Sequence, residues 1–254
     1  MDMKTILGLA ALAIPLMVDA ADCTVKSGPR TNALVELYTS EGCSSCPPAD
    51  RWIARFAGAH PVAGVVPIAF HVHYWDYIGW KDTFADPRFT ERQRDFAKAG
   101  GARSVYTPQV VVAGRDFPEW RDADGFAGAI DTITHKPARA TLSISPSVKA
   151  DGTLHAQVSA TLASGVKHAD LALFVVPTQG GLGNDVTAGE NRGEKLRHEY
   201  VVRSLAAIER FGDVTPVEFT PRIGWNPERM AIVAFVQNVK TGEVLQALSA
   251  PVCR

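Results

Sequence analysis

The sequence of 254 residues predicts an α/β domain followed by an all-β sandwich domain, and three features point to this division. Strand-like and helix-like segments alternate between residues 33 and 135, which is typical of helices layered on a sheet. From residue 138 onward, short strand-like segments and turn dipeptides replace this alternation. Lys136-Pro137 lies between the two patterns, so we place the domains at residues 30–137 and 138–254.

The first half begins with a largely apolar segment at residues 33–38, as expected for a strand buried in a parallel sheet. Pro47 and Pro48 suit the first turn of a helix. Asp86 suits the N-cap of another helix, because Pro87 follows it. The expected elements are strands over 33–38, 65–72 and 109–112, and helices that begin between 43 and 48, at 87 and at 122.

The second half contains short strand candidates joined by turns. Asp151-Gly152 and Thr241-Gly242 are hairpin-type turn dipeptides. Residues 189–193 are interpreted as a turn that docks the two halves, with no chemistry assigned to it. The strand candidates of the sandwich are 141–145, 154–160, 171–176, 217–219, 230–236 and 244–248.

The N-terminus has the pattern of a secretory signal peptide. Lys4 precedes an apolar run at residues 6–14, and Val18-Asp19-Ala20 resembles a small-residue cleavage site. We therefore interpret residues 1–20 as a cleaved signal peptide and expect a periplasmic or secreted protein. The alternative is an N-terminal membrane anchor, but the run is short for a bilayer span.

The net charge and the lack of long apolar segments argue against nucleic acid and membrane partners. The formal net charge is −1, so no bulk field attracts nucleic acid or anionic membranes. No later segment is long and apolar enough to insert stably into a membrane after signal cleavage. Neither a phosphate-binding loop nor a Ser-His-Asp or H-E-x-x-H signature is present in the sequence.

The cysteines suggest two disulfides in an oxidising compartment. Cys43 and Cys46 form a C-x-x-C pair, whereas Cys23 and Cys253 lie near the two ends of the mature chain. The economical pairing makes Cys43–Cys46 a redox pair and Cys23–Cys253 a structural disulfide. Four cysteines allow three pairings, and the other two remain open at this point.

The C-x-x-C pair carries the sharpest chemical signal. At a helix N-terminus, the helix dipole and the free N–H groups stabilise a thiolate on the first cysteine. We therefore expect Cys43 to be the exposed, more acidic nucleophile and Cys46 the buried resolving thiol. Zinc sites also use C-x-x-C, but they usually add a second pair of ligands, and no second C-x-x-C exists here.

Two motifs together resemble the thioredoxin-like superfamily. Residues 34–38 lead into Cys43-Ser44-Ser45-Cys46, and Tyr106-Thr107-Pro108 precedes a valine-rich strand. The resemblance implies that Pro108 is cis and lies beside Cys43, and that Thr107 presents its backbone to a substrate strand. Thioredoxins usually have Trp before the first cysteine and Gly-Pro between the cysteines, where this chain has Gly42 and Ser44-Ser45, so the direction of electron flow stays open.

A narrower resemblance covers nearly the whole mature chain. Residues 35–50, 70–82 and 189–193 are similar to DUF1223, a family of exported thioredoxin-like proteins of unknown function. This resemblance implies the fold and leaves the function to be argued from the residues.

Other polar residues near the motif admit two interpretations each. Glu36 lies near the place where thioredoxins bury an Asp, so it is a candidate to accept the Cys46 proton, or else it forms a salt bridge. His71 and His73 alternate on one face of a strand, as metal ligands with the two cysteines or with His71 as a modulator of the thiolate, although a hydrogen-bonded structural His71 and a solvent-facing His73 are favoured. The aromatic residues of the loop that follows are candidates for a partner-binding rim or for core packing.

The leading hypothesis is an exported thiol–disulfide oxidoreductase that acts on a protein thiol or disulfide. Cys43, Cys46 and Glu36 are its catalytic candidates, Thr107 and Pro108 its substrate-binding candidates, and no organic cofactor or bound metal is expected. One alternative is a metal-binding protein or chaperone that uses Cys43, Cys46 and His71. The other is a non-catalytic thioredoxin-like binding module with an inert disulfide.

Overall fold

The computed structural model describes residues 23–57 and 62–253, and the expected signal peptide at residues 1–20 lies outside them. The α-helices are α1 (Pro47–Ala54), α2 (Pro87–Ala99) and α3 (Ala123–Thr134), with short 3-10 helices η1 (Asp76–Ile78) and η2 (Pro227–Arg229). The strands of the first half are β1 (Val25–Lys26), β2 (Ala33–Thr39), β3 (Val65–His71), β4 (Gln109–Val112) and β5 (Arg115–Asp116). Those of the second half are β6 (Ala140–Val148), β7 (Leu154–Leu162), β8 (Leu171–Gln179), β9 (Leu182–Asp185), β10 (Lys195–His198), β11 (Val201–Val202), β12 (Ala206–Ile208), β13 (Thr215–Phe219), β14 (Met230–Asn238) and β15 (Val244–Pro251).

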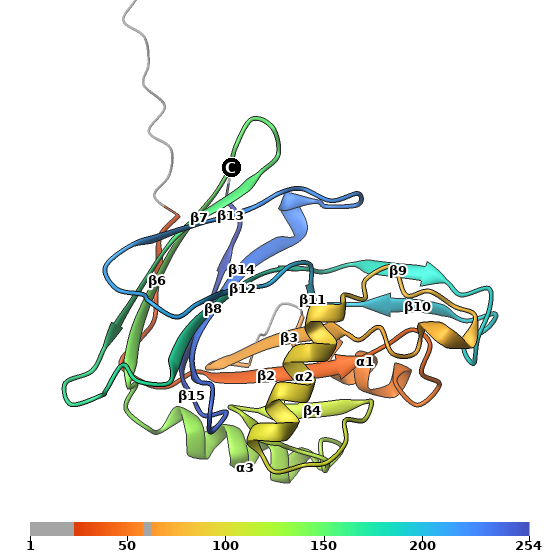
Figure 1. Ribbon diagram of the computed structural model, residues 1–254, viewed down its shortest axis with the longest axis horizontal. Coiled ribbons are helices and arrows are strands. Elements are labelled where there is room, and N and C mark those ends of the chain that lie inside the picture. Colours follow the sequence, from red (N-terminus) through yellow and green to blue (C-terminus); the bar gives the residue numbers. More distant parts are fainter. Residues whose placement is uncertain (1–22, 58–61, 254) are drawn as a thin grey trace, which may run out of the picture.

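A 9-stranded sheet runs through the centre of the molecule (Figure 1). Its order is β15-β14-β8-β11-β3-β2-β4-β5, with β12 paired to β8. Strand β2 pairs in parallel with β3 and antiparallel with β4. The short strand β11 joins the two halves, because it pairs in parallel with β3 and antiparallel with β8. Strands from both predicted domains therefore belong to one sheet, while the division at residue 137 stays a prediction.

Helices cover both faces of the first half of this sheet. Val35 and Leu37 of β2 contribute to a buried cluster with residues of α1 and α3 on one face. Leu34 and Tyr38 contribute to a second cluster, which includes Phe89 of α2, on the other. This division follows from the strand period, since successive side chains point to opposite faces. Figure 1 shows α2 crossing the front of the sheet and α3 lying below it.

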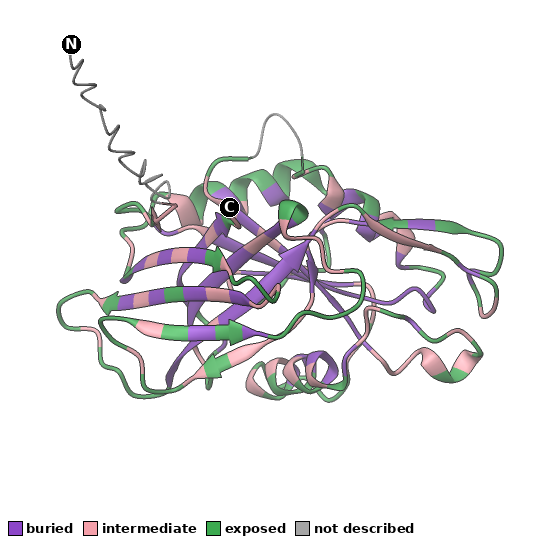
Figure 2. Cartoon of the chain, turned by 90° about the horizontal axis from the view of Figure 1, so that it is seen from above, coloured by how far each residue is buried: buried purple, intermediate pink, exposed green. Residues whose placement is uncertain are grey.

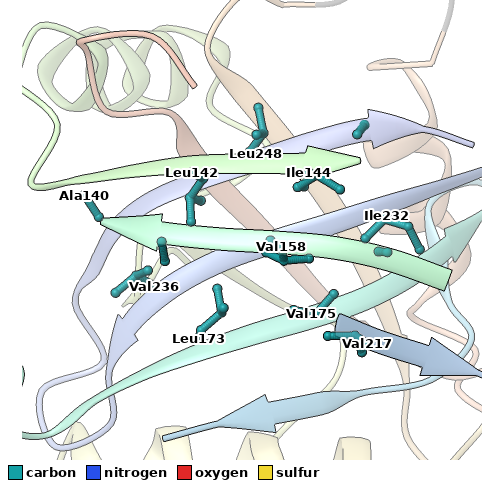
Figure 3. Close-up of a cluster of buried hydrophobic side chains, with 14 of the residues drawn as sticks. Ala140, Leu142, Ile144, Val158, Leu173, Val175, Val217, Ile232, Val236 and Leu248 are labelled. Atoms are coloured by element: carbon teal, nitrogen blue, oxygen red, sulfur yellow. The ribbon is translucent and has the colours of Figure 1, made fainter. Parts of the chain in front are cut away.

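A 4-stranded sheet packs against the second half of the large sheet. Its order is β1-β6-β7-β13, and β6 and β7 alternate between buried and more exposed residues. The buried residues of the small sheet form one hydrophobic cluster with apolar side chains of β8, β14 and β15. Figure 3 shows Leu142 and Val158 of the small sheet within this cluster. Figure 2 shows the central strands largely buried and the outward surfaces of the helices exposed.

The ends of the described chain are joined. Cys23 and Cys253 form a disulfide with a Cα–Cα distance of 6.1 Å across 230 residues of sequence. Strand β1 pairs with β6, so the segment after Cys23 is also held by the small sheet. Within the described part of the chain, no helix has the length and apolar character that crossing a bilayer requires.

Candidate functional site

The C-x-x-C turn lies between the end of β2 and the start of α1. Cys43 N donates to Ser40 O at 3.2 Å, and Cys46 N donates to Cys43 O at 3.1 Å, which closes two successive turns. Cys46 is the N-cap of α1, and Pro47 and Pro48 occupy the first helical turn. Both sulfurs are joined in a disulfide with a Cα–Cα distance of 5.4 Å. The expected helix thus begins within the predicted interval, directly after the cysteine pair.

The Cys43–Cys46 disulfide is covered. Cys43 and Cys46 both have 0% exposure, while Ser44 and Ser45 between them are exposed. The expectation that Cys43 is the more exposed cysteine is therefore not met in this oxidised state. Gly42 is also tightly packed, because a Cβ atom there would lie 2.9 Å from the Trp75 side chain. Neither sulfur is therefore open to another molecule in this conformation.

The Thr107–Pro108 peptide is cis, as the thioredoxin-like resemblance implies, and its loop contacts the cysteine turn. Ser45 Oγ lies 3.3 Å from Cys43 Sγ and 3.5 Å from the Thr107 carbonyl oxygen, which accepts its hydrogen bond. The Thr107 hydroxyl accepts a hydrogen bond of 2.7 Å from Trp75 Nε1. The cysteine turn, the cis-proline loop and the aromatic loop therefore meet at one place.

A loop from the second half of the chain closes over the cysteine turn. The Glu190 carboxylate accepts hydrogen bonds from the backbone N–H of Ser44 at 3.1 Å and from its hydroxyl at 2.7 Å. These bonds lower the pKa of Glu190. The buried Asn191 amide donates to the carbonyl oxygens of Glu41 and Cys43 at 2.7 and 3.0 Å. The segment interpreted only as a docking turn is thus part of the site.

A buried charged cluster lies next to this turn. Glu41 has 0% exposure, and its carboxylate accepts hydrogen bonds from His198 Nε2 at 3.1 Å, from Trp80 Nε1 at 3.0 Å and from the Asn184 amide. His198 Nδ1 lies 3.8 Å from Asp50 Oδ1. That distance is too long for a hydrogen bond, so the Asp50–His198 contact is an ion pair.

The cluster holds His198 in its charged form. Burial alone would lower the pKa of His198, but the carboxylates of Asp50 and Glu41 outweigh it and raise the pKa to about 10. Asp50 is buried on α1, and its second carboxylate oxygen has no hydrogen-bond partner among the described residues. The site therefore pairs one imidazolium with two carboxylates beside the disulfide.

His71 and His73 separate into different surroundings. His71 Nδ1 lies 2.7 Å from Asp82 Oδ2, both side chains are fully buried, and the His71 ring meets the His198 ring edge-on at 4.7 Å between centroids. Burial tends to raise the pKa of Asp82, but His71 and backbone N–H donors outweigh it and lower that pKa. His73 instead contacts the Thr90 hydroxyl through Nδ1 at 2.7 Å. His71 thus makes the expected structural hydrogen bond, whereas His73 is half-buried and hydrogen-bonded, not solvent-facing.

Glu36 is engaged on the other side of the sheet. Its Oε2 accepts hydrogen bonds from Arg92 Nε at 3.0 Å, from Arg92 Nη2 at 2.7 Å and from the Tyr38 hydroxyl at 3.2 Å. By strand alternation, Glu36 shares the α2 face of β2 with Leu34 and Tyr38, whereas the face with α1 carries Val35 and Leu37. Its carboxylate therefore forms a buried salt bridge, the second of the two interpretations of this residue.

The main cavity of the described structure lies away from the cysteine turn. Among the described residues, no group of three or more His, Cys, Asp or Glu side chains is arranged to hold a metal ion. A cavity of about 850 Å³ lies between α2 and the β8–β14 region, and residues such as Arg92 and Phe174 line it. Neither cysteine is among its lining residues.

Asp50, Glu41 and His198 are the site residues that sequence reasoning missed. Asp50 follows Cys46 by four positions, which is a signal that helical periodicity could have provided. His198 could not be found in this way, because it reaches Glu41 from 157 residues further along the chain.

Comparisons with known proteins support the fold and identify a family. The model of a family described as "Protein of unknown function (DUF1223)" matches residues 34–237. No curated protein shows a significant match to the chain. A crystal structure of a protein from Agrobacterium tumefaciens is similar, with 23% identity, a TM-score of 0.63 and coverage of 88% of this chain and 96% of that one. HBP35 of Porphyromonas gingivalis has 13% identity and a TM-score of 0.65, with coverage of 89% of this chain and 76% of that one.

Proposed function

This chain belongs to the DUF1223 family, and we propose that it is an exported thiol–disulfide oxidoreductase with a thioredoxin-like first domain. Its substrate is a thiol or disulfide of another protein, and a dithiol or disulfide partner protein restores the Cys43–Cys46 pair. Export is supported by the signal-like N-terminal sequence and by two disulfides, which persist in oxidising compartments.

One observation carries the proposal: a short-loop disulfide at a helix N-terminus adjoins the Thr107–Pro108 loop. The Cys43–Cys46 bond spans 3 positions and precedes α1, where the helix dipole stabilises a thiolate once the bond is reduced. Ser45 links this turn to the Thr107 carbonyl oxygen. An extended substrate segment placed along the Thr107 backbone would bring its sulfur to Cys43.

In the reducing direction, the Cys43 thiolate attacks a substrate disulfide. A Cys43–substrate S–S bond forms, the substrate S–S bond breaks, and the departing sulfur takes a proton. Cys46 then loses its proton and attacks Cys43 Sγ, so that the Cys43–Cys46 bond forms and the second substrate thiol leaves. Two electrons pass from the cysteine pair to the substrate. Oxidation of a substrate dithiol is the reverse sequence.

Opening of the site is part of this proposal. Both cysteines are fully buried, and the Ser44–Glu190 and Cys43–Asn191 hydrogen bonds attach the second half of the chain to the turn. We therefore propose that residues 189–193 move away when a substrate docks. This contribution gives the second half of the chain a role in controlling access.

Trapping of a mixed disulfide tests the proposal. Replacing Cys46 with Ala should leave a covalent adduct between Cys43 and a substrate protein or a model disulfide peptide, detected by non-reducing electrophoresis and mass spectrometry. Replacing Cys43 with Ala should abolish the adduct. If the Cys46→Ala protein forms no adduct, although its Cys43 thiol is alkylated after denaturation, the oxidoreductase proposal is wrong.

A second candidate is a binding module whose Cys43–Cys46 disulfide is structural. The observation that favours it is the 0% exposure of both cysteines. In that case the disulfide should resist strong reductant in the folded protein, and the cover should not open in the presence of a peptide substrate.

A further inference from the structure

We propose that Asp50 and His198 form the proton-exchange pair of the Cys43–Cys46 couple, with Asp50 accepting the Cys46 proton and His198 positioning the Asp50 carboxylate. This inference rests on the proposed oxidoreductase function and deepens it. It also assigns part of the redox chemistry to β10, a strand of the second half of the chain.

The place of Asp50 on α1 puts it next to the resolving cysteine. Cys46 has helical backbone angles, with φ −79° and ψ −37°, and its carbonyl oxygen accepts a hydrogen bond from Asp50 N at 3.1 Å. Residues four apart on a helix share one face, with Cβ atoms about 5–6 Å apart. Asp50 is therefore the acidic side chain that the helix holds beside Cys46.

The surroundings of Asp50 leave one of its oxygens available. Its side chain has only 6% exposure. Oδ1 faces His198 Nδ1, while Oδ2 is buried without a hydrogen-bond partner in the described structure. A buried acceptor without a hydrogen-bond partner is costly, so its presence in a folded protein calls for an explanation such as a catalytic role. The free oxygen is the atom that we assign to receive the proton.

His198 fixes the position of this carboxylate. Its Nε2 is bound to Glu41 at 3.1 Å and its Nδ1 faces Asp50, so that one cation lies between two carboxylates. The His198 ring also packs edge-to-face against the His71 ring, and His71 in turn contacts Asp82. The imidazolium at this place orients the Asp50 carboxylate through Oδ1 and leaves Oδ2 for the proton.

The proton step completes the second half of the thiol exchange. When Cys43 is joined to the substrate, the Cys46 S–H bond breaks and the proton passes to Asp50 Oδ2. The Cys46 thiolate attacks Cys43 Sγ, and the substrate sulfur leaves with the bonding electron pair. Solvent then takes the proton from Asp50. In the oxidising direction, the protonated Asp50 carboxyl group returns its proton to the Cys46 thiolate.

The attack of Cys46 on a mixed disulfide at Cys43, here called collapse of the adduct, can be measured separately from the initial attack by Cys43. The full-length mature protein, with Cys43 and Cys46 reduced and Cys23–Cys253 intact, is treated with a thionitrobenzoate disulfide at acidic pH, where collapse is slow. A jump to neutral pH then releases thionitrobenzoate as Cys46 attacks, and the absorbance gives the rate. Asp50→Asn should slow this release by about a hundredfold, the lower end of what positioned acid–base groups contribute.

Matched variants separate the role of Asp50 from folding. Asp50→Glu keeps a carboxylate and should restore most of the rate, and Asp95→Asn makes the same change at an exposed position of α2. His198→Gln should slow the collapse while leaving the rate of adduct formation at Cys43 unchanged, because the Asp50 carboxylate loses the ion pair that orients it. The rate of adduct formation at Cys43 reports whether each variant is folded.

The possible results distinguish this inference from the function on which it rests. Asp50→Asn collapse at the wild-type rate would overturn the role of Asp50, and His198→Gln collapse at the wild-type rate would overturn the role of His198. Either result leaves the oxidoreductase function standing. A wild-type protein that forms no adduct, or whose adduct never collapses, would instead defeat the proposed function and this inference with it.

Discussion

The Glu190 carboxylate binds both the backbone N–H and the hydroxyl of Ser44, across 146 residues of sequence. Ser44 lies between the two cysteines, so this contact ties the second half of the chain to the disulfide turn. It occupies the Ser44 N–H group in the turn before α1 and places a negative charge next to Cys43. Both effects oppose formation of a Cys43 thiolate.

Glu190→Gln should therefore loosen the cover and favour the thiolate. We expect dithiothreitol to reduce the Cys43–Cys46 bond roughly two- to fivefold faster, a modest effect because the contact is exposed to solvent. The measured pKa of the Cys43 thiol should also fall. Glu194→Gln, at an exposed position of the same segment, serves as the control. Equal reduction rates for Glu190→Gln and the wild type would show that this contact does not control access.

Arg92→Met should strongly destabilise the fold. Arg92 and Glu36 form a salt bridge whose side chains are only 9% and 1% exposed, and removal of the arginine leaves a buried carboxylate without its cation. Breaking such a pair costs about 3–5 kcal/mol, measured as the free energy of unfolding in urea. Replacing both residues, as Glu36→Leu with Arg92→Met, should recover much of the loss. The exposed Arg94→Met change should cost less than about 0.5 kcal/mol, and a similar cost for Arg92→Met would contradict the assignment.

Stability should decline at alkaline pH because of His198. Its folded-state pKa of about 10 is above its ordinary value of 6.5, so the folded protein retains a proton that the unfolded chain releases. The contribution of His198 is complete below pH 6.5 and is lost as the pH rises to about 10. The slope approaches about 1.4 kcal/mol per pH unit for one proton.

Urea unfolding of the wild type and of His198→Gln at several pH values between neutral and alkaline checks this decline. The difference between the two proteins should shrink as the pH rises, because only the wild type loses the imidazolium contribution. Parallel curves would mean that His198 is not protonated in the folded protein at neutral pH.

The local parts of the fold were the ones that sequence could predict. Helix α2 (Pro87–Ala99) begins at the predicted residue because Asp86 accepts the N-cap hydrogen bond from Arg88 N, a relationship within two positions. The helix start depends on neighbours in sequence, where propensity and capping act directly. The cis peptide at Thr107–Pro108 was implied by the resemblance to the thioredoxin-like superfamily.

The parts that sequence could not predict depend on distant pairings. Strand β11 is only Val201–Val202, too short to show a period, yet it joins β3 to β8 and makes the large sheet continuous. Strand β10 is largely polar, so no apolar pattern marked His198 as a buried residue. Glu36 was predicted as either a proton acceptor or a salt-bridge partner, and only the position of Arg92 distinguishes the two interpretations.

The reduction potential of the Cys43–Cys46 pair tests the central claim most directly. The protein is equilibrated in dithiothreitol or glutathione buffers of defined potential, and the fraction of reduced pair is counted by alkylation and mass spectrometry. We predict reversible titration with a midpoint within the range of catalytic pairs, about −270 to −120 mV. A pair that stays oxidised below about −300 mV, like structural disulfides of secreted proteins, would contradict the account.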